Sequence, residues 1–182
     1  MHANYLLACQ KISNKKIRQI IWKIRATKIV LATGSIERFL TFDNNDRPGI
    51  MLANSVRKFQ NYYFNKDVKK IVIFSNNDTA YQTAIDFFYK QEVEVRAIID
   101  VRKNSNGDLV KKAKELGIKI FFNHAVIDTK GRKKINSVII SELNESLDKT
   151  INKSKELSCD LLCVSGGWTP TVHLFSQSKG KL

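Results

Sequence analysis

A turn of small and polar residues, Ser75-Asn76-Asn77-Asp78-Thr79-Ala80, follows an apolar run at 71–74 and carries the first recognisable chemistry. In a G-x-G-x-x-G loop the glycines allow a tight turn close to a dinucleotide's pyrophosphate, which the next helix N-terminus binds. The glycine positions here hold Ser75, Asn77 and Ala80. Alanine is accepted at the third position, and asparagine tolerates left-handed backbone angles. Asn76, Asn77 and Asp78 are therefore candidate nucleotide-binding residues.

Asp78 has two opposite effects in this turn. It would cap the helix, yet its charge would repel a phosphate. The side chains that replace the glycines also leave less room for a pyrophosphate to approach the backbone of the turn. A capped turn without a ligand is therefore the alternative interpretation.

Asp100 supports the dinucleotide interpretation. It follows the strand predicted over 93–99 and lies 23 positions beyond Asn77. An acidic side chain there accepts hydrogen bonds from the adenosine ribose and favours NAD over NADP. The alternative is an ordinary loop residue that pairs with Arg102.

Two further turns carry glycine after an apolar run. Val30-Leu31 leads into Ala32-Thr33-Gly34, and Leu161–Val164 leads into Ser165-Gly166-Gly167-Trp168. Small residues let the backbone turn sharply and approach a ligand closely. Thr33, Gly34, Gly166 and Gly167 complete the set of candidate cofactor-binding residues.

Neither a catalytic site nor a metal site is predicted. Cys159 and Cys163 have C-x3-C spacing, which differs from that of zinc ribbons and redox motifs, so we interpret them as buried apolar residues. The three histidines, at positions 2, 124 and 173, cluster with neither cysteines nor carboxylates. Ser165 lacks the G-x-S-x-G elbow of a serine hydrolase.

The elements that position these residues alternate in type. Strands are predicted over 71–74, 93–99 and 118–122, and helices over 78–90 and 107–116. This βαβαβ pattern is typical of a mononucleotide-binding half with a parallel sheet. The fold class is therefore predicted to be α/β, with a Rossmann-like parallel sheet.

The flanking segments are read mainly as strands and loops. The pattern predicts a β-hairpin over 5–12 and 19–25 with one buried face, and a buried strand at 29–31. A loop is expected over 35–49 and a helix over 51–64. Antiparallel strands over 126–129 and 135–143 form a β extension, a polar loop follows, and 161–164 is a last buried strand.

Composition excludes several classes of protein. The 182 residues are 43% hydrophobic, enough to bury the core of one domain or of one domain with pieces of another. No apolar run is long enough for a membrane span, and the start does not resemble a secretory signal, so a cytoplasmic location is expected. The net charge of +14 comes from scattered lysine pairs without interleaved aromatic residues, which argues against nucleic-acid binding.

Several motifs resemble a known family. They are Ala32-Thr33-Gly34 with Glu37-Arg38, Asn44 to Ala53, Asn76 to Tyr81, and Ser165 to Pro170 with His173 to Gln177. Together they are similar to the alpha subunits of heterotetrameric sarcosine oxidases, among the two-dinucleotide-domain flavoproteins related to disulfide reductases. The resemblance covers nearly the whole chain.

The resemblance implies an FAD/NAD(P)-binding fold in three parts. Residues 1–50 would be part of a first dinucleotide-binding domain, 51–150 an inserted NAD-binding-like domain, and 151–182 the return to the first domain. Family subunits are several times longer, so the chain would be an internal piece and inactive alone.

The resemblance also implies an activity, which is the oxidative demethylation of sarcosine by a complex with beta and smaller subunits. NAD would bind the alpha subunit, FAD and FMN would be present in the full complex, and folate would bind the full subunit. Two alternatives stay open: a generic pyridine nucleotide-disulfide oxidoreductase-like domain, and a non-catalytic scaffold whose nucleotide site has decayed.

Overall fold

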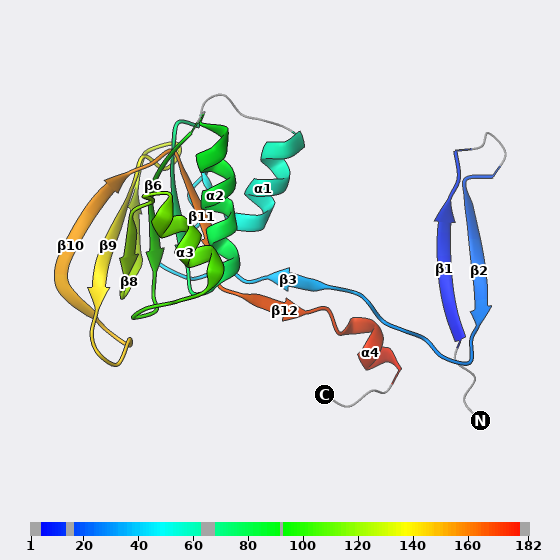
Figure 1. Cartoon of the computed structure of the whole chain (residues 1–182). Coiled ribbons are helices and arrows are strands. Elements are labelled where there is room, and N and C mark those ends of the chain that lie inside the picture. Colours follow the sequence, from blue (N-terminus) through cyan, green and yellow to red (C-terminus); the bar gives the residue numbers. More distant parts are fainter. Residues whose placement is uncertain (1–4, 14–16, 63–67, 92, 179–182) are drawn as a thin grey trace. The chain divides into compact units, whose positions relative to one another are not determined.

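The computed structural model describes residues 5–13, 17–62, 68–91 and 93–178. The chain divides into two compact units, Ser35–Thr169 and a smaller unit made of Met1–Gly34 with Pro170–Leu182 (Figure 1).

A five-stranded parallel sheet is the centre of the larger unit. Its strand order is β4-β11-β5-β6-β7, and every neighbouring pair is parallel. The strands are β4 (Ile50–Leu52), β11 (Leu161–Ser165), β5 (Lys70–Ser75), β6 (Glu94–Asp100) and β7 (Ile120–Phe122). The predicted parallel sheet is confirmed.

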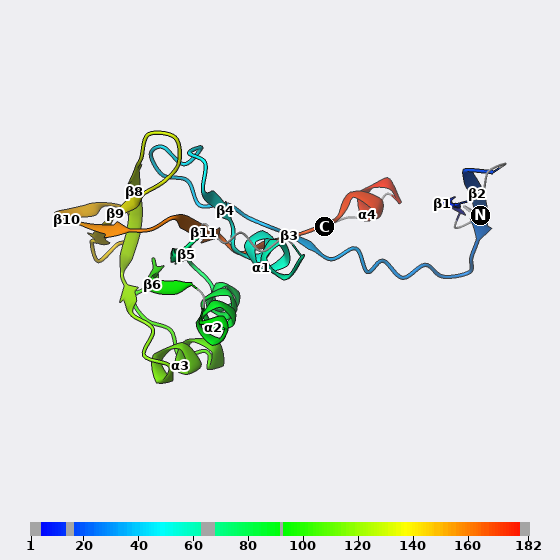
Figure 2. The ribbon, with the colours of Figure 1, turned by 90° about the horizontal axis from the view of Figure 1, so that it is seen from above.

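The central strands read as continuous apolar runs because both sheet faces are covered. Ile71 and Ile73 of β5 pack on the helical side, whereas Val72 and Phe74 pack on the opposite side. Figure 2 shows β5 and β6 between the helices and the strands β8, β9 and β10. The unit therefore has three layers, and its core lies on both faces of the parallel sheet.

Three helices cover one face of this sheet. They are α1 (Ala53–Tyr62), α2 (Tyr81–Lys90) and α3 (Asp108–Glu115), and the short 3-10 turn η1 (Asp78–Ala80) precedes α2. The helices predicted over 78–90 and 107–116 are confirmed. The one predicted from residue 51 begins at Ala53, because 50–52 form the edge strand β4. Its predicted last residues, 63 and 64, lie outside the described residues.

An antiparallel sheet covers the other face, in the order β10-β9-β8. Its strands are β8 (His124–Lys130), β9 (Ser137–Leu143) and β10 (Thr150–Ser158). The predicted β extension is confirmed, but the loop predicted after residue 143 was wrong because it contains β10. This strand looks polar in the sequence because it is an edge strand with exposed lysines, which discourage pairing with another chain.

The loop predicted over 35–49 also contains a strand. Ser35–Glu37 forms β3, which pairs with β12 (Trp168–Pro170). Backbone hydrogen bonds extend this pairing, since Arg38 N donates to Gly167 O at 2.8 Å and Gly166 N donates to Arg38 O at 2.7 Å. These bonds hold the Gly166-Gly167 turn against a segment distant in sequence.

The smaller unit contains the predicted hairpin, β1 (Tyr5–Lys11) with β2 (Gln19–Arg25), and the short helix α4 (His173–Gln177). The prediction of a buried hairpin face was wrong, because no described residue of either strand is buried. Two strands alone cannot bury a face between them. The strand predicted at 29–31 is also absent, and Val30 is 91% exposed.

Candidate nucleotide site

The carboxyl ends of β5 and β11 meet where the strand order of the parallel sheet reverses. From β5 the chain adds β6 and then β7 on one side, and β11 inserts on the other. In open α/β sheets, ligands bind in the crevice outside the strand ends at such a switch point. Asn76 and Asn77 follow β5, and Gly166 and Gly167 follow β11. The fold therefore brings together four of the predicted cofactor-binding residues.

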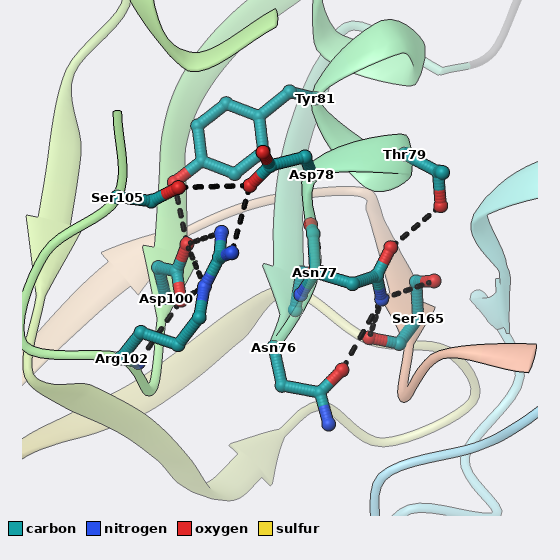
Figure 3. Close-up of polar contacts among 10 residues, drawn as sticks. Asn76, Asn77, Asp78, Thr79, Tyr81, Asp100, Arg102, Ser105 and Ser165 are labelled. Carbon is teal, nitrogen blue, oxygen red and sulfur yellow. Dashed lines mark hydrogen bonds and ion pairs between the residues drawn. The ribbon is translucent and has the colours of Figure 1, made fainter. Parts of the chain in front are cut away.

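Asn77 connects the two strand ends through its side chain (Figure 3). Its amide nitrogen donates to Ser165 O at 3.2 Å and to Ser165 Oγ at 3.1 Å. Its backbone is extended, with φ of −147°, so the tolerance of asparagine for left-handed angles is not used here. Ser75 Oγ accepts a hydrogen bond from Asn77 N at 3.0 Å. Side-chain hydrogen bonds therefore stabilise the turn after β5, whereas a glycine-rich loop has only backbone groups for this purpose.

Asn76 lies nearest to the glycine turn after β11. Its backbone N donates to Ser165 O at 3.3 Å, and its side-chain amide donates to Gly166 O at 3.4 Å. A Cβ on Gly166 would lie 3.0 Å from Phe39 O, and Gly167 has a φ of +92°. Both glycines are therefore required, one by close backbone packing and the other by a left-handed backbone.

Asp78 does not cap the helix as predicted. The residue at the N-cap of η1 is Asn77, and its side chain makes no capping bond. Asp78 Oδ1 instead accepts a hydrogen bond from Ser105 Oγ at 2.9 Å and forms an ion pair with Arg102 Nη1 at 2.7 Å. The side chain therefore points toward the loop after β6.

Asp100 is fully buried at the end of β6. Its Oδ2 accepts hydrogen bonds from Tyr81 Oη at 2.6 Å and Arg102 Nη2 at 2.7 Å, and its Oδ1 accepts one from Arg102 Nε at 3.0 Å. We call Asp78, Tyr81, Asp100, Arg102 and Ser105 the Arg102 cluster. Both oxygens of Asp100 are already bonded within it.

The pKa shifts of Tyr81 and Arg102 agree with the hydrogen bonds of the Arg102 cluster. Burial, followed by the hydrogen bond to Asp100, raises the pKa of Tyr81 well above its usual value. The hydrogen bond to Asp100 is also the main cause of the raised pKa of Arg102. The phenol therefore stays protonated as a donor, and the guanidinium stays charged between two carboxylates.

Thr33 and Gly34 belong to the smaller unit. Thr33 Oγ1 donates to Thr171 O at 2.5 Å, and Thr171 N donates to Gly34 O at 2.9 Å. Gly34 has a φ of +70°, and a Cβ there would meet nothing within 4 Å. Glycine is therefore favoured at this position by the positive φ and not by a lack of space for a side chain.

Sequence reasoning missed two members of the Arg102 cluster. Arg102 was considered only as a partner of Asp100, and Tyr81 and Ser105 were not selected. The available signal was a tyrosine at the start of a helix whose inward face is mostly apolar. A buried phenol needs a hydrogen-bond partner, and the polar end of β6 is the nearest predicted source.

The site fits a dinucleotide better on one side than on the other. Beside β11, Gly167 is partly exposed, and a Cβ there would meet only Asn76 Oδ1, at 3.9 Å, so a ligand has room to approach. Beside β6, the carboxylate that would bind a ribose is buried and paired with Arg102. Within the described ranges, the structure contains neither a group of three or more potential metal ligands nor a helix long and apolar enough to cross a membrane.

Sequence comparison confirms the resemblance to sarcosine oxidase alpha subunits. The protein from Corynebacterium sp. (strain P-1) is 39% identical over 167 residues, which are 91% of this chain and 17% of that protein. The protein from strain U-96 is 35% identical over 190 residues, covering 99% of this chain and 19% of its own. The chain thus spans less than a fifth of the length of these relatives. No model of a known protein family matches the sequence.

Comparison with solved structures confirms the fold class. Thioredoxin reductase from T. acidophilum superposes with a TM-score of 0.69 at 18% identity, covering 97% of this chain and 57% of that one. An FAD-dependent pyridine nucleotide-disulphide oxidoreductase from Desulfovibrio vulgaris gives 0.60 at 16% identity, with 87% and 40% covered. The chain has a Rossmann-like α/β fold.

Proposed function

Because the chain is a relative of sarcosine oxidase alpha subunits, we propose that it is the nucleotide-binding part of such a subunit. The full complex would oxidatively demethylate sarcosine. Its beta and smaller subunits would be the partners, FAD and FMN would be present in the complex, and folate would bind elsewhere on the full subunit. The complex would be cytoplasmic and would bind neither nucleic acid nor membrane.

The observation that carries the proposal is the switch point between β5 and β11. NAD would lie across the ends of these strands, against Asn76, Asn77, Gly166 and Gly167. Its pyrophosphate would approach the start of α2, and its adenosine ribose would lie toward Asp78 and Asp100. When bound, NAD supplies a nicotinamide that accepts or donates a hydride.

The chain's own residues would bind and orient the nucleotide, and none of them would act as a catalytic residue. Thr33 and Gly34 would contribute a cofactor contact from the first dinucleotide-binding domain, residues 1–50 with 151–182. Residues 51–150 would form the inserted domain, and these limits remain a proposal.

A second candidate function is a scaffold whose nucleotide site has decayed. The specific observation in its favour is the Arg102 cluster, which bonds both oxygens of Asp100 internally. A ribose can reach that carboxylate only if Arg102 or Tyr81 moves. On this interpretation, the polar edge stabilises the fold and binds nothing.

Titration calorimetry with NAD distinguishes the two functions. We expect the 182-residue chain to bind NAD, and Asn76→Ala to weaken binding about threefold to tenfold, the size of one lost hydrogen bond. Asn136→Ala is the matched control, because Asn136 is exposed and bonds Cys159 N near the amino end of β11. If neither the chain nor the variants bind NAD, the scaffold interpretation is correct.

A second measurement tests the division of labour among the subunits. Oxygen consumption with sarcosine should be absent from the purified chain, even with FAD and NAD added. It should be present in a complex that contains the partner subunits. Turnover of sarcosine by the chain alone would overturn the proposed role.

A further inference from the structure

The strongest unexplained feature is the ion pair between Asp78 and Arg102. It joins the start of α2 to the loop after β6, across the side of the site where the adenosine ribose is proposed to lie (Figure 3). The inference below rests on the proposed function. Asp100 was expected to select NAD over NADP, but it is fully buried and paired, so it offers no acceptor to a ribose.

The residue type at position 107 indicates that the fold reserves space for the Asp78 carboxylate. A Cβ on Gly107 would overlap the Asp78 carboxylate. The backbone of Gly107, with φ of −60° and ψ of 154°, is open to any residue, so glycine is not needed for the angle. Its small size provides the space that the carboxylate occupies. Ser105 Oγ supplies a further hydrogen bond to the same carboxylate at 2.9 Å.

Arg102 has the chemistry of a phosphate receptor, but two carboxylates occupy it. Its Nε and Nη2 donate to Asp100, and its Nη1 bonds Asp78. In Rossmann-type sites, an arginine near this position accommodates the 2′-phosphate of NADP. Here the outward bond of the guanidinium goes to Asp78, whose side chain is 35% exposed. Asp100 holds the inner side of Arg102, and Asp78 takes the outer side, where a ligand anion would bind.

We propose that Asp78 occupies on Arg102 the position of a ligand phosphate, and thereby excludes the 2′-phosphate of NADP from the nucleotide site. Asp78 is then the residue that determines specificity, and Asp100 only orients Arg102. An NAD ribose, which carries no charge, is repelled much less by the Asp78 carboxylate than a 2′-phosphate is.

The test is Asp78→Asn, with NAD and NADP titrated separately by calorimetry. The variant keeps the shape of the side chain and removes its charge, so the asparagine oxygen holds Arg102 Nη1 more weakly and no longer repels a phosphate. We expect NADP to bind at least about tenfold tighter than to the unmodified chain, the effect of one charge-assisted hydrogen bond. NAD affinity should rise much less than NADP affinity, because the two nucleotides share the same pyrophosphate and only NADP carries a 2′-phosphate beside Asp78.

The matched control is Asp108→Asn. Asp108 is next to Gly107, but its side chain is fully exposed and its nearest cation is Lys111 at 3.6 Å. It changes the net charge equally without touching Arg102, so neither affinity should change. Asp78→Ser is a second variant, used if Asp78→Asn does not give the native circular dichroism spectrum.

The outcomes separate the two proposals. If the unmodified chain binds NAD and the Asp78 variants gain no affinity for NADP, the inference about Asp78 is wrong and the proposed function stands. If NADP binds the variants while NAD binds none of the proteins, the inference stands and the proposed NAD site is wrong. If neither nucleotide binds any protein, both are wrong. A gain in NADP affinity with Asp108→Asn also overturns the role of Asp78.

Discussion

Tyr81 at the first turn of α2 donates a 2.6 Å hydrogen bond to Asp100 at the end of β6, and both residues are fully buried. This bond ties the helical layer to the carboxyl edge of the parallel sheet. It also explains a phenol on a helix face otherwise made of residues such as Ala84 and Ile85. Arg102 also bonds both oxygens of this buried carboxylate, through Nε to Oδ1 and Nη2 to Oδ2, which compensates for the water that Asp100 loses on burial.

Tyr81→Phe is therefore expected to destabilise the larger unit. The substitution keeps the ring and removes one donor from a buried carboxylate, so the free energy of unfolding should fall by about 1 to 3 kcal/mol. Urea denaturation followed by circular dichroism measures the change. Tyr89→Phe is the control, because Tyr89 is 58% exposed, and it should cost much less. Equal effects of the two substitutions would contradict the importance of the Tyr81 bond.

Stability should fall in alkaline solution. Burial raises the pKa of the Cys159 thiol from 9.0 to about 12, and it raises the pKa of Tyr81 as well. The folded state holds these protons after the unfolded state has lost them, so their contribution is complete below pH 9 and declines as the pH rises toward 12.

Urea midpoints at pH 7 and pH 10.5 measure this decline. Cys159→Ala removes one of the buried groups with a raised pKa, so the same pH change should lower its midpoint less. A midpoint that rises with pH over this range would contradict the prediction.

Only one of the three cysteines should react rapidly with a thiol reagent at pH 8. Cys9 is exposed, whereas Cys159 and Cys163 are buried, and burial raises the pKa of both buried thiols. Since the thiolate is the nucleophile, a colorimetric disulfide reagent should titrate one group in the native chain and three in denaturant. Rapid loss of two or three thiols from the folded protein would show that Cys159 or Cys163 is accessible, contrary to their burial.

The purified chain should associate as its concentration increases. Cross-strand pairing in the hairpin places Leu6 beside Ile24 and Ala8 beside Trp22, so one of its faces is apolar. Trp22 is 51% exposed, and such a face favours contact with a second copy. Light scattering should detect oligomers. The double substitution Trp22→Gln with Ile24→Thr should lower the fraction of oligomers.

Leu7→Thr is the control for this prediction, because Leu7 is 61% exposed but pairs with Lys23 on the opposite face. It should leave association unchanged. If it reduces association as strongly as the double variant, the apolar face is not the contact surface.

The sequence alone determined the central layer and the residues at its switch point. Runs such as 71–74 are apolar at every position because both faces of the strand are covered, and this periodicity is a local property that can be read directly. The turns after them carry Asn76, Asn77, Gly166 and Gly167, and parallel strands bring such turns to one edge. The family resemblance also rested on local motifs, and sequence comparison confirmed it.

Only the tertiary structure decided the elements whose local pattern is weak or whose partners are distant. The sequence of β10 predicts a polar loop because an edge strand needs little apolar surface. The strand forms because its backbone can hydrogen-bond to that of β9. The apolar pattern of the hairpin predicted a buried face, but burial requires a covering layer, which periodicity does not supply. Likewise, the sequence indicated that Asp100 could pair with Arg102, two residues away. Tyr81 and Asp78 meet this pair only because α2 packs on β6, a contact that spacing along the chain does not encode.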